Sequence, residues 1–135
     1  MQIFINEASS INIMGKFDEI CRKIKSLEIQ GAENIAKAGL VAYSIKPGKD
    51  SIKKLLSLRP TEPCLENALR FVEKNSVKDA YEYLEESDEK IAKIGAKLVK
   101  GDVYTHCHSS SVNKVLAEAK KTKRFRVYCT ETRPR

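Results

Sequence analysis

The sequence lacks any apolar run that could cross a membrane, because a spanning helix needs about 20 consecutive apolar residues. Residues 1–6 show no basic segment followed by a long apolar core, so no secretory signal is predicted. Internal repeats and low-complexity tracts are also missing. We therefore expect a cytoplasmic protein without a membrane partner, whose 135 residues form one ordinary domain or two small ones.

A paired C-x-x-C motif is missing as well. The four cysteines are widely spaced, and in a cytoplasmic protein they are expected to be free thiols. His106, Cys107 and His108 are adjacent, so on a strand their side chains would alternate between opposite faces and could not readily bind one ion. Since no second cluster supplies the remaining ligands, a zinc site is disfavoured, and neither a metal nor a cofactor is expected.

The chain is 41% hydrophobic and 32% charged, which is too apolar for a wholly disordered protein. Its net charge of +7 is concentrated at one end, because residues 114–135 hold eight Lys or Arg against two Glu. A basic end can serve a nucleic acid, an acidic partner or a phosphorylated ligand, or it can be only a solvated helix face with an exposed tail. Nucleic acid is disfavoured, because no aromatics are interleaved with the basic residues and no known module is present.

Apolar residues recur every three or four positions through most of the first hundred residues, which predicts helices. Breaks are expected at Gly31–Ala32, at the turn Pro47–Gly48 and across residues 59–63, with a helix resuming at Leu65. Ser76 followed by Asp79 predicts a cap on a helix of roughly 22 residues. The expected buried positions include Phe17, Ile20, Cys21, Ile24, Leu27, Ile35, Leu40, Val41, Leu55, Leu69, Ala80, Leu84, Ile91, Ala92 and Leu98.

The pattern changes at Gly101. Residues 102–106 are predicted to form a short buried strand, Ser109–Ser111 a helix cap, and residues 125–130 a second strand. A strand, helix and strand at this spacing predict parallel strands with a right-handed crossover. We thus expect an α+β or α/β protein, with an N-terminal helical domain at 1–99 and the first β-α-β unit of a Rossmann-like domain at 100–135. Two strands alone do not make a stable open sheet, so this domain is expected to be incomplete.

The segment Thr105–Ser110 falls between the first predicted strand and the next helix, where open α/β sheets bind ligands. The amides at a helix start suit a phosphate and would favour the thiolate of Cys107, while His106 and the serines could donate hydrogen bonds. The alternative interpretation is that Cys107 is a small buried residue and that Ser109 and Ser110 are only caps.

Two pieces of the sequence, Gly101–Val112 and Cys129–Arg135, resemble a signature of the translation initiation factor 2B superfamily. Leu27–Ala32 and Leu58–Leu69 resemble its two upstream motifs, in the same order. The superfamily contains the alpha, beta and delta subunits of that factor, ribose-1,5-bisphosphate isomerases and methylthioribose-1-phosphate isomerases. The resemblance runs from about residue 18 to the end of the chain, and four ordered pieces are more specific than any one of them.

The resemblance to the isomerases implies that Cys107 is the acid–base residue of an aldose–ketose conversion. It also implies that a sugar phosphate or nucleoside phosphate contacts Gln30, Gly31, Ala32 and Arg59, in addition to His106, Ser109 and Ser110 beside Cys107. Arginine suits this role, because a guanidinium can grip a phosphate through two hydrogen bonds.

Two departures from the family pattern stand beside this expectation. Gln30 replaces an arginine that is common in the ribose-bisphosphate isomerases, and the family's catalytic aspartate and Asn-Lys motif lie beyond the part matched here. The alternative function is therefore a non-catalytic regulatory subunit with an initiation-factor partner. A homodimer or higher oligomer is implied for an intact form.

Overall fold

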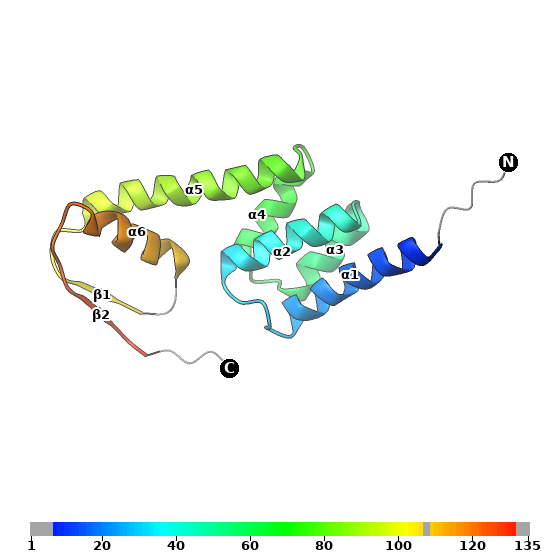
Figure 1. The fold of residues 1–135 in the computed structure, drawn as a ribbon, viewed down its shortest axis with the longest axis horizontal. Helices are drawn as coiled ribbons and strands as arrows, with labels where there is room; N and C mark the ends of the chain where they lie inside the picture. Colours follow the sequence, from blue (N-terminus) through cyan, green and yellow to red (C-terminus); the bar gives the residue numbers. More distant parts are fainter. Residues whose placement is uncertain (1–6, 107–108, 132–135) are drawn as a thin grey trace. The chain divides into compact units, whose positions relative to one another are not determined.

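The computed structural model describes residues 7–106 and 109–131, with side chains from residue 15 onward. The chain divides into two compact units, residues 1–81 and 82–135. Figure 1 shows the elements in chain order. They are α1 (Glu7–Lys25), α2 (Ala32–Ile45), α3 (Lys49–Leu58), α4 (Pro63–Val72), α5 (Val77–Leu98), β1 (Val103–Thr105), α6 (Ser110–Lys120) and β2 (Val127–Cys129).

The first unit is a helical cluster in which α2 packs mainly against α4 and α1. The predicted breaks lie between its helices, and Gly48 at the start of α3 adopts a φ of 127° that favours glycine. All four helices contribute large side chains to one core, and burying each such side chain stabilises the fold by roughly 1.5–3 kcal/mol. The core residues are Phe17, Cys21, Ile24, Ile35, Ala42, Leu55, Leu65 and Leu69.

Three expectations about the first unit need correction. Leu27 does not continue the buried face of α1, because the helix ends at Lys25 and Leu27 turns into a left-handed conformation with φ 64° and is 42% exposed. Val41 is also on the exposed side of its helix. The helix expected from Leu65 begins earlier, at Pro63, because proline's fixed φ and missing amide suit the first turn of a helix.

Helix α5 begins with the predicted capping box. The backbone amide of Ser76 donates to Asp79 Oδ2 at 3.0 Å, and the amide of Asp79 donates to Ser76 Oγ at 3.1 Å. The helix has the predicted 22 residues, but its apolar stripe is only partly buried. Ala80 and Ala92 are buried, whereas Ile91 and Leu98 are exposed, contrary to the sequence interpretation.

The second unit contains a two-stranded parallel sheet and α6. Val103 pairs with Val127, and Tyr104 and Thr105 pair with Tyr128 and Cys129. The amide of Val103 donates to the carbonyl of Arg126 at 2.9 Å, and Asp102 accepts from both the amide and Nε of Arg126 at 2.9 Å. The first strand is not buried as expected, because Tyr104 is 71% exposed on a sheet of two strands.

The described chain is therefore mostly helical with a small parallel sheet, which confirms the α+β class. Parallel pairing of β1 and β2 around α6 is also confirmed. None of the helices in residues 7–106 or 109–131 has the length and apolar character needed to cross a membrane.

Candidate functional site

The start of α6 is organised by Ser109. Its side-chain oxygen accepts a hydrogen bond from the amide of Val112 at 3.3 Å, and its carbonyl accepts from the amide of Asn113 at 3.0 Å. Ser109 is half-buried, while Ser110 opens the first turn and is exposed. A serine oxygen that accepts one hydrogen bond still carries a proton to donate, so this helix start can offer hydroxyl donors as well as amides to an anion.

His106 lies directly after β1, and its ring is tied to the residue that follows β2. His106 Nδ1 and Thr130 Oγ1 are 2.6 Å apart, and the backbone amide of Thr130 donates to the carbonyl of Thr105 at 3.3 Å. The carboxyl ends of the two parallel strands are thus joined by one backbone and one side-chain hydrogen bond. His106 is itself exposed at this edge of the sheet.

The predicted acid–base residue, Cys107, lies outside the described residues, together with His108. The described chain stops at His106, directly after β1, and resumes at Ser109, the cap of α6. Cys129, the residue paired with Thr105, is an exposed free thiol. Cys21, by contrast, is buried, and burial raises the pKa of its thiol.

The second candidate segment is Gln30–Ala32, at the start of α2. Gly31 occupies the N-cap position of α2 with a φ of 86°, a conformation that favours glycine, so no side chain caps this helix. The side-chain amide of Asn34 donates to the carbonyl of Gln30 at 3.1 Å, and the amide of Ile35 donates to that of Gly31 at 3.0 Å. Gln30, Gly31 and Ala32 are all exposed, so a ligand can reach the backbone there.

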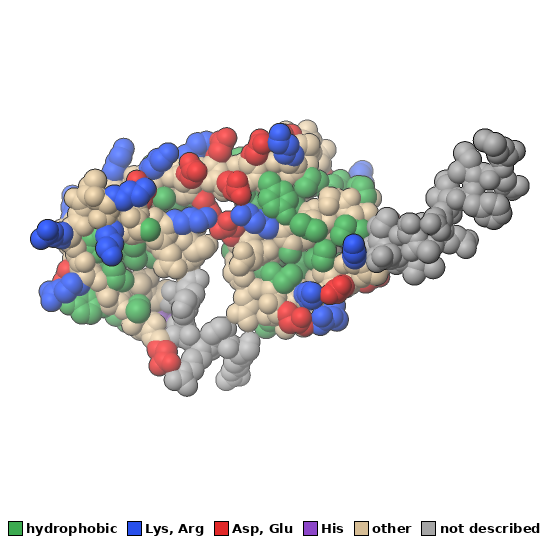
Figure 2. Space-filling model, in the orientation of Figure 1, with side chains coloured by type: hydrophobic (Ala, Val, Ile, Leu, Met, Phe, Trp, Pro, Cys, Tyr) green, Lys and Arg blue, Asp and Glu red, His purple; other side chains and the backbone are tan. Residues whose placement is uncertain are grey.

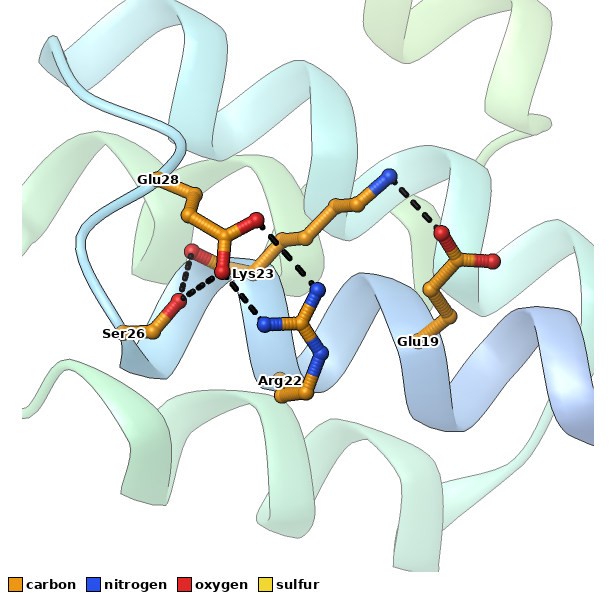
Figure 3. A network of polar contacts seen from close by, with 5 residues as sticks. All are labelled: Glu19, Arg22, Lys23, Ser26 and Glu28. Carbon is orange, nitrogen blue, oxygen red and sulfur yellow. Dashed lines mark hydrogen bonds and ion pairs between the residues drawn. The ribbon is translucent and has the colours of Figure 1, made fainter.

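A network of polar contacts holds the loop that leads to this segment (Figure 3). Glu28 pairs with Arg22 of α1 and accepts a hydrogen bond from Ser26 Oγ at 2.9 Å. The Arg22 hydrogen bond is the main cause of the lowered pKa of the Glu28 carboxyl, with Ser26 second. These contacts accompany the left-handed turn at Leu27, which explains why the apolar periodicity of α1 fails at that position.

Arg59 follows the last residue of α3 and begins the loop before α4. It forms an ion pair with Glu62, with Nη2 and Oε2 3.4 Å apart, and its carbonyl accepts from the amide of Glu62 at 3.2 Å. Both side chains are largely covered, at 26% and 15% exposure. Arg59 is therefore held in place by a carboxylate that would compete with a phosphate for its guanidinium.

The structure groups the predicted site residues in two sets. His106, Ser109 and Ser110 lie together at the β1–α6 junction of the second unit, while Gln30–Ala32 and Arg59 belong to the first. No hydrogen bond or ion pair joins Arg59 to Gln30–Ala32 in the described part of the chain. Among those residues there is also no group of three His, Cys, Asp or Glu that could hold a metal ion.

Basic side chains gather on the second unit, as Figure 2 shows. A hollow of about 550 Å³ on this unit has walls of mixed apolar and basic character. None of the predicted site residues lines it, so it gives no support to their assignment. The lining residues are Leu116, Ala117, Lys120, Lys123, Arg124, Phe125 and Val127.

Sequence reasoning missed Thr130, which holds the ring of His106. The signal for this contact is the register of the two strands. Because Thr105 pairs with Cys129, the residues that follow them, His106 and Thr130, lie side by side. That register is not visible in either strand alone.

Comparison with known proteins gives one family. A model of the Initiation factor 2 subunit family matches residues 24–135. A ribose 1,5-bisphosphate isomerase of Pyrococcus furiosus is 35% identical over 154 aligned residues, covering 87% of this chain and 48% of that protein. The same enzyme of Methanocaldococcus jannaschii is 34% identical, covering 87% and 47%.

A protein of Pyrococcus horikoshii described as putative translation initiation factor eIF-2B subunit 2-like is also similar. It is 34% identical, covering 86% of this chain and 50% of that protein. The chain thus spans about half the length of the curated relatives that it matches.

Proposed function

Because this chain belongs to the Initiation factor 2 subunit family, we propose that it carries one part of a ribose 1,5-bisphosphate isomerase site, centred on Cys107. The observation that supports this most is the junction between β1 and α6. There Ser109 caps the helix and Thr130 holds His106, on either side of the cysteine in the sequence. In this proposal, the remaining residues of the site correspond to the half of the relatives that this chain does not match.

In the proposed reaction an aldose phosphate becomes a ketose phosphate without gain or loss of atoms. The C2–H bond breaks and a C1–H bond forms, while the bond between C1 and the ring oxygen breaks. The C2 hydroxyl becomes a carbonyl, and its proton goes to the released ring oxygen. Cys107 would take or return the carbon-bound proton, which requires a thiolate held within hydrogen-bond reach of the sugar. The amides at the start of α6 favour the thiolate, because they carry partial positive charge.

A phosphate needs hydrogen-bond donors, and each unit is considered by itself. In the second unit, His106, Ser109 and Ser110 would serve a phosphate near Cys107. In the first unit, Arg59 and the backbone at Gln30–Ala32 are the proposed phosphate contacts. The proposal further includes a Rossmann-like sheet that continues from β1 and β2, a cytoplasmic location and an oligomeric intact form. The open edges of a two-stranded sheet agree with a sheet that extends further.

A second function is supported by the similarity to the Pyrococcus horikoshii protein described as initiation-factor-like. Gln30 cannot supply positive charge to a phosphate, which favours a weaker or different ligand. In this alternative the chain keeps the fold and a phosphate pocket, and it acts as a regulatory subunit with an initiation-factor partner.

The test is conversion of ribose 1,5-bisphosphate to ribulose 1,5-bisphosphate by this chain and by any longer natural form that contains it. Cys107→Ser should abolish measurable turnover, whereas the matched control Cys129→Ser should retain it, because Cys129 has no role in the proposed chemistry. Turnover that survives Cys107→Ser would overturn the catalytic role of this cysteine. No turnover in the longer form at high substrate concentration would favour the regulatory function instead.

A further inference from the structure

The hydrogen bond between His106 and Thr130 has a chemical consequence for the proposed phosphate site. A neutral imidazole carries its proton on one ring nitrogen and accepts at the other. His106 Nδ1 lies 2.6 Å from Thr130 Oγ1, while Nε2 has no hydrogen-bond partner in residues 15–106 and 109–131. The partner of Nδ1 therefore decides what Nε2 can offer to a ligand.

Two assignments of the proton are compatible with the distance. Either Nδ1–H donates to Thr130 Oγ1, or the threonine hydroxyl donates to Nδ1 and the ring proton sits on Nε2. In the described part of the chain, the Thr130 hydroxyl has no acceptor other than Nδ1. Donation to Nδ1 uses that hydroxyl proton and leaves Nε2–H exposed at the strand end.

We propose that Thr130 is a positioning residue for the isomerase site, which fixes His106 as the Nε2–H tautomer so that a neutral imidazole donates to a substrate phosphate. This inference rests on the proposed function. Thr130 belongs to the family signature, but the reaction proposed above gives it no role. The backbone bond from Thr130 to Thr105 adds to the fixed geometry, because it holds the threonine at the register position opposite His106.

In the proposed arrangement the ring accepts from Thr130 at Nδ1 and donates to the phosphate through Nε2–H. Thr130 acts only through His106, so its loss should weaken substrate binding more than it slows the chemical step.

The first test needs no turnover and uses the 135-residue chain. With His108→Gln in all samples, His106 is the sole histidine, since the chain has two. The ¹⁵N chemical shifts of the His106 ring are measured above neutral pH in the parent, which keeps Thr130, and in the variants Thr130→Ser and Thr130→Val. The parent and Thr130→Ser should show shifts of the Nε2–H tautomer, and Thr130→Val, which has the same shape without a hydroxyl, should show averaging between both tautomers.

Backbone amide spectra of the β1–β2 pair serve as the folding control in the same samples. Unchanged ring shifts in a folded Thr130→Val protein, or a parent in the Nδ1–H tautomer, would overturn the proposal. This outcome is separate from the proposed function, because it is read without substrate.

The second test uses the form that turns over ribose 1,5-bisphosphate. Thr130→Val should raise KM by roughly 3- to 10-fold, the range expected for loss of one hydrogen bond, with kcat within about twofold. Thr130→Ser should restore KM to within about twofold of the parent. A drop in kcat at unchanged KM, or failure of serine to rescue, would show that Thr130 does not act through phosphate binding.

Discussion

Gly39 in α2 lies so close to the buried side chain of Leu65 in α4 that a Cβ atom at position 39 would be 2.3 Å from Leu65 Cδ1. Helices α2 and α4 make the most extensive helix–helix contact of the first unit, and this glycine permits their approach. Alanine is the better helix former, by about 1 kcal/mol, so any loss of stability must come from the contact.

We expect Gly39→Ala to lower the free energy of unfolding by roughly 1–2 kcal/mol, because an inserted methyl costs about 1–3 kcal/mol in a packed core and the helix preference offsets part of it. The matched control is Gly15→Ala in α1, where no described atom outside its own stretch of helix lies within 4 Å of the added Cβ. The control should be neutral or stabilising. Urea unfolding measures both, and equal effects of the two variants would contradict the packing explanation.

The capping box of α5 predicts a pH dependence. Hydrogen bonds from the Ser76 side chain and backbone lower the pKa of the Asp79 carboxyl. A folded-state pKa below the unfolded value means that the stabilisation is present above the unfolded pKa and is lost as the pH falls through the folded one. NMR titration of Asp79 should give a value below that of a model peptide, and Ser76→Ala should bring it back towards that value. Ser76→Thr, which keeps the hydroxyl, should not.

Helices α1 to α5 could be predicted from the sequence because their signals are local. Apolar spacing and the pair Ser76–Asp79 act within a few residues of one another. The failure at Leu27 involves a contact between residues six apart, which apolar spacing does not report. Leu27 follows the apolar period of α1, but the contact of Arg22 with Glu28 accompanies a turn that removes it from the helix.

Exposure was harder to predict than element type. Tyr104, Ile91 and Leu98 are apolar residues in predicted elements, yet all three are exposed, because burial depends on which other elements cover a face. At the candidate site, the Ser109 cap was predicted from the residues beside it. The pairing of His106 with Thr130 was not, since it needs the register of strands that are 24 residues apart.

Lys123 gives a prediction for the second unit. Its ammonium donates to three backbone carbonyls at the end of α5, those of Ala96 at 2.7 Å, Lys97 at 3.0 Å and Val99 at 2.7 Å. A cation here also complements the negative end of the helix. Lys123→Met should therefore destabilise this unit by about 1.5–3 kcal/mol, the range for hydrogen bonds to a charged group.

The measurement for Lys123→Met is hydrogen exchange at the amide of Val103, which reports the pairing of β1 with the segment before β2. Lys121→Met is the control, because Lys121 makes an exposed ion pair with Glu118, and such pairs are worth roughly 0–1 kcal/mol. Faster exchange in both variants alike would show that the carbonyl contacts have no special role.

Arg59 and Glu62 should have opposite effects on ligand binding if Arg59 contacts a phosphate. Arg59→Gln should weaken binding of ribose 1,5-bisphosphate by roughly 10-fold or more, because it removes a charge-assisted hydrogen bond. Glu62→Gln should strengthen it, since it removes the carboxylate that competes for the guanidinium. Calorimetry on the substrate-binding form measures both, and weaker binding in both variants would point to a structural ion pair.

The most direct measurement of the central claim is protection of Cys107 from alkylation by ribose 1,5-bisphosphate, followed by mass spectrometry of each cysteine peptide. We expect the sugar phosphate to slow labelling of Cys107 several-fold and to leave labelling of the exposed Cys129 unchanged, with Cys21 slow throughout because it is buried. Equal labelling of Cys107 with and without the sugar phosphate, in this chain and in a longer form alike, would contradict a substrate site at this cysteine.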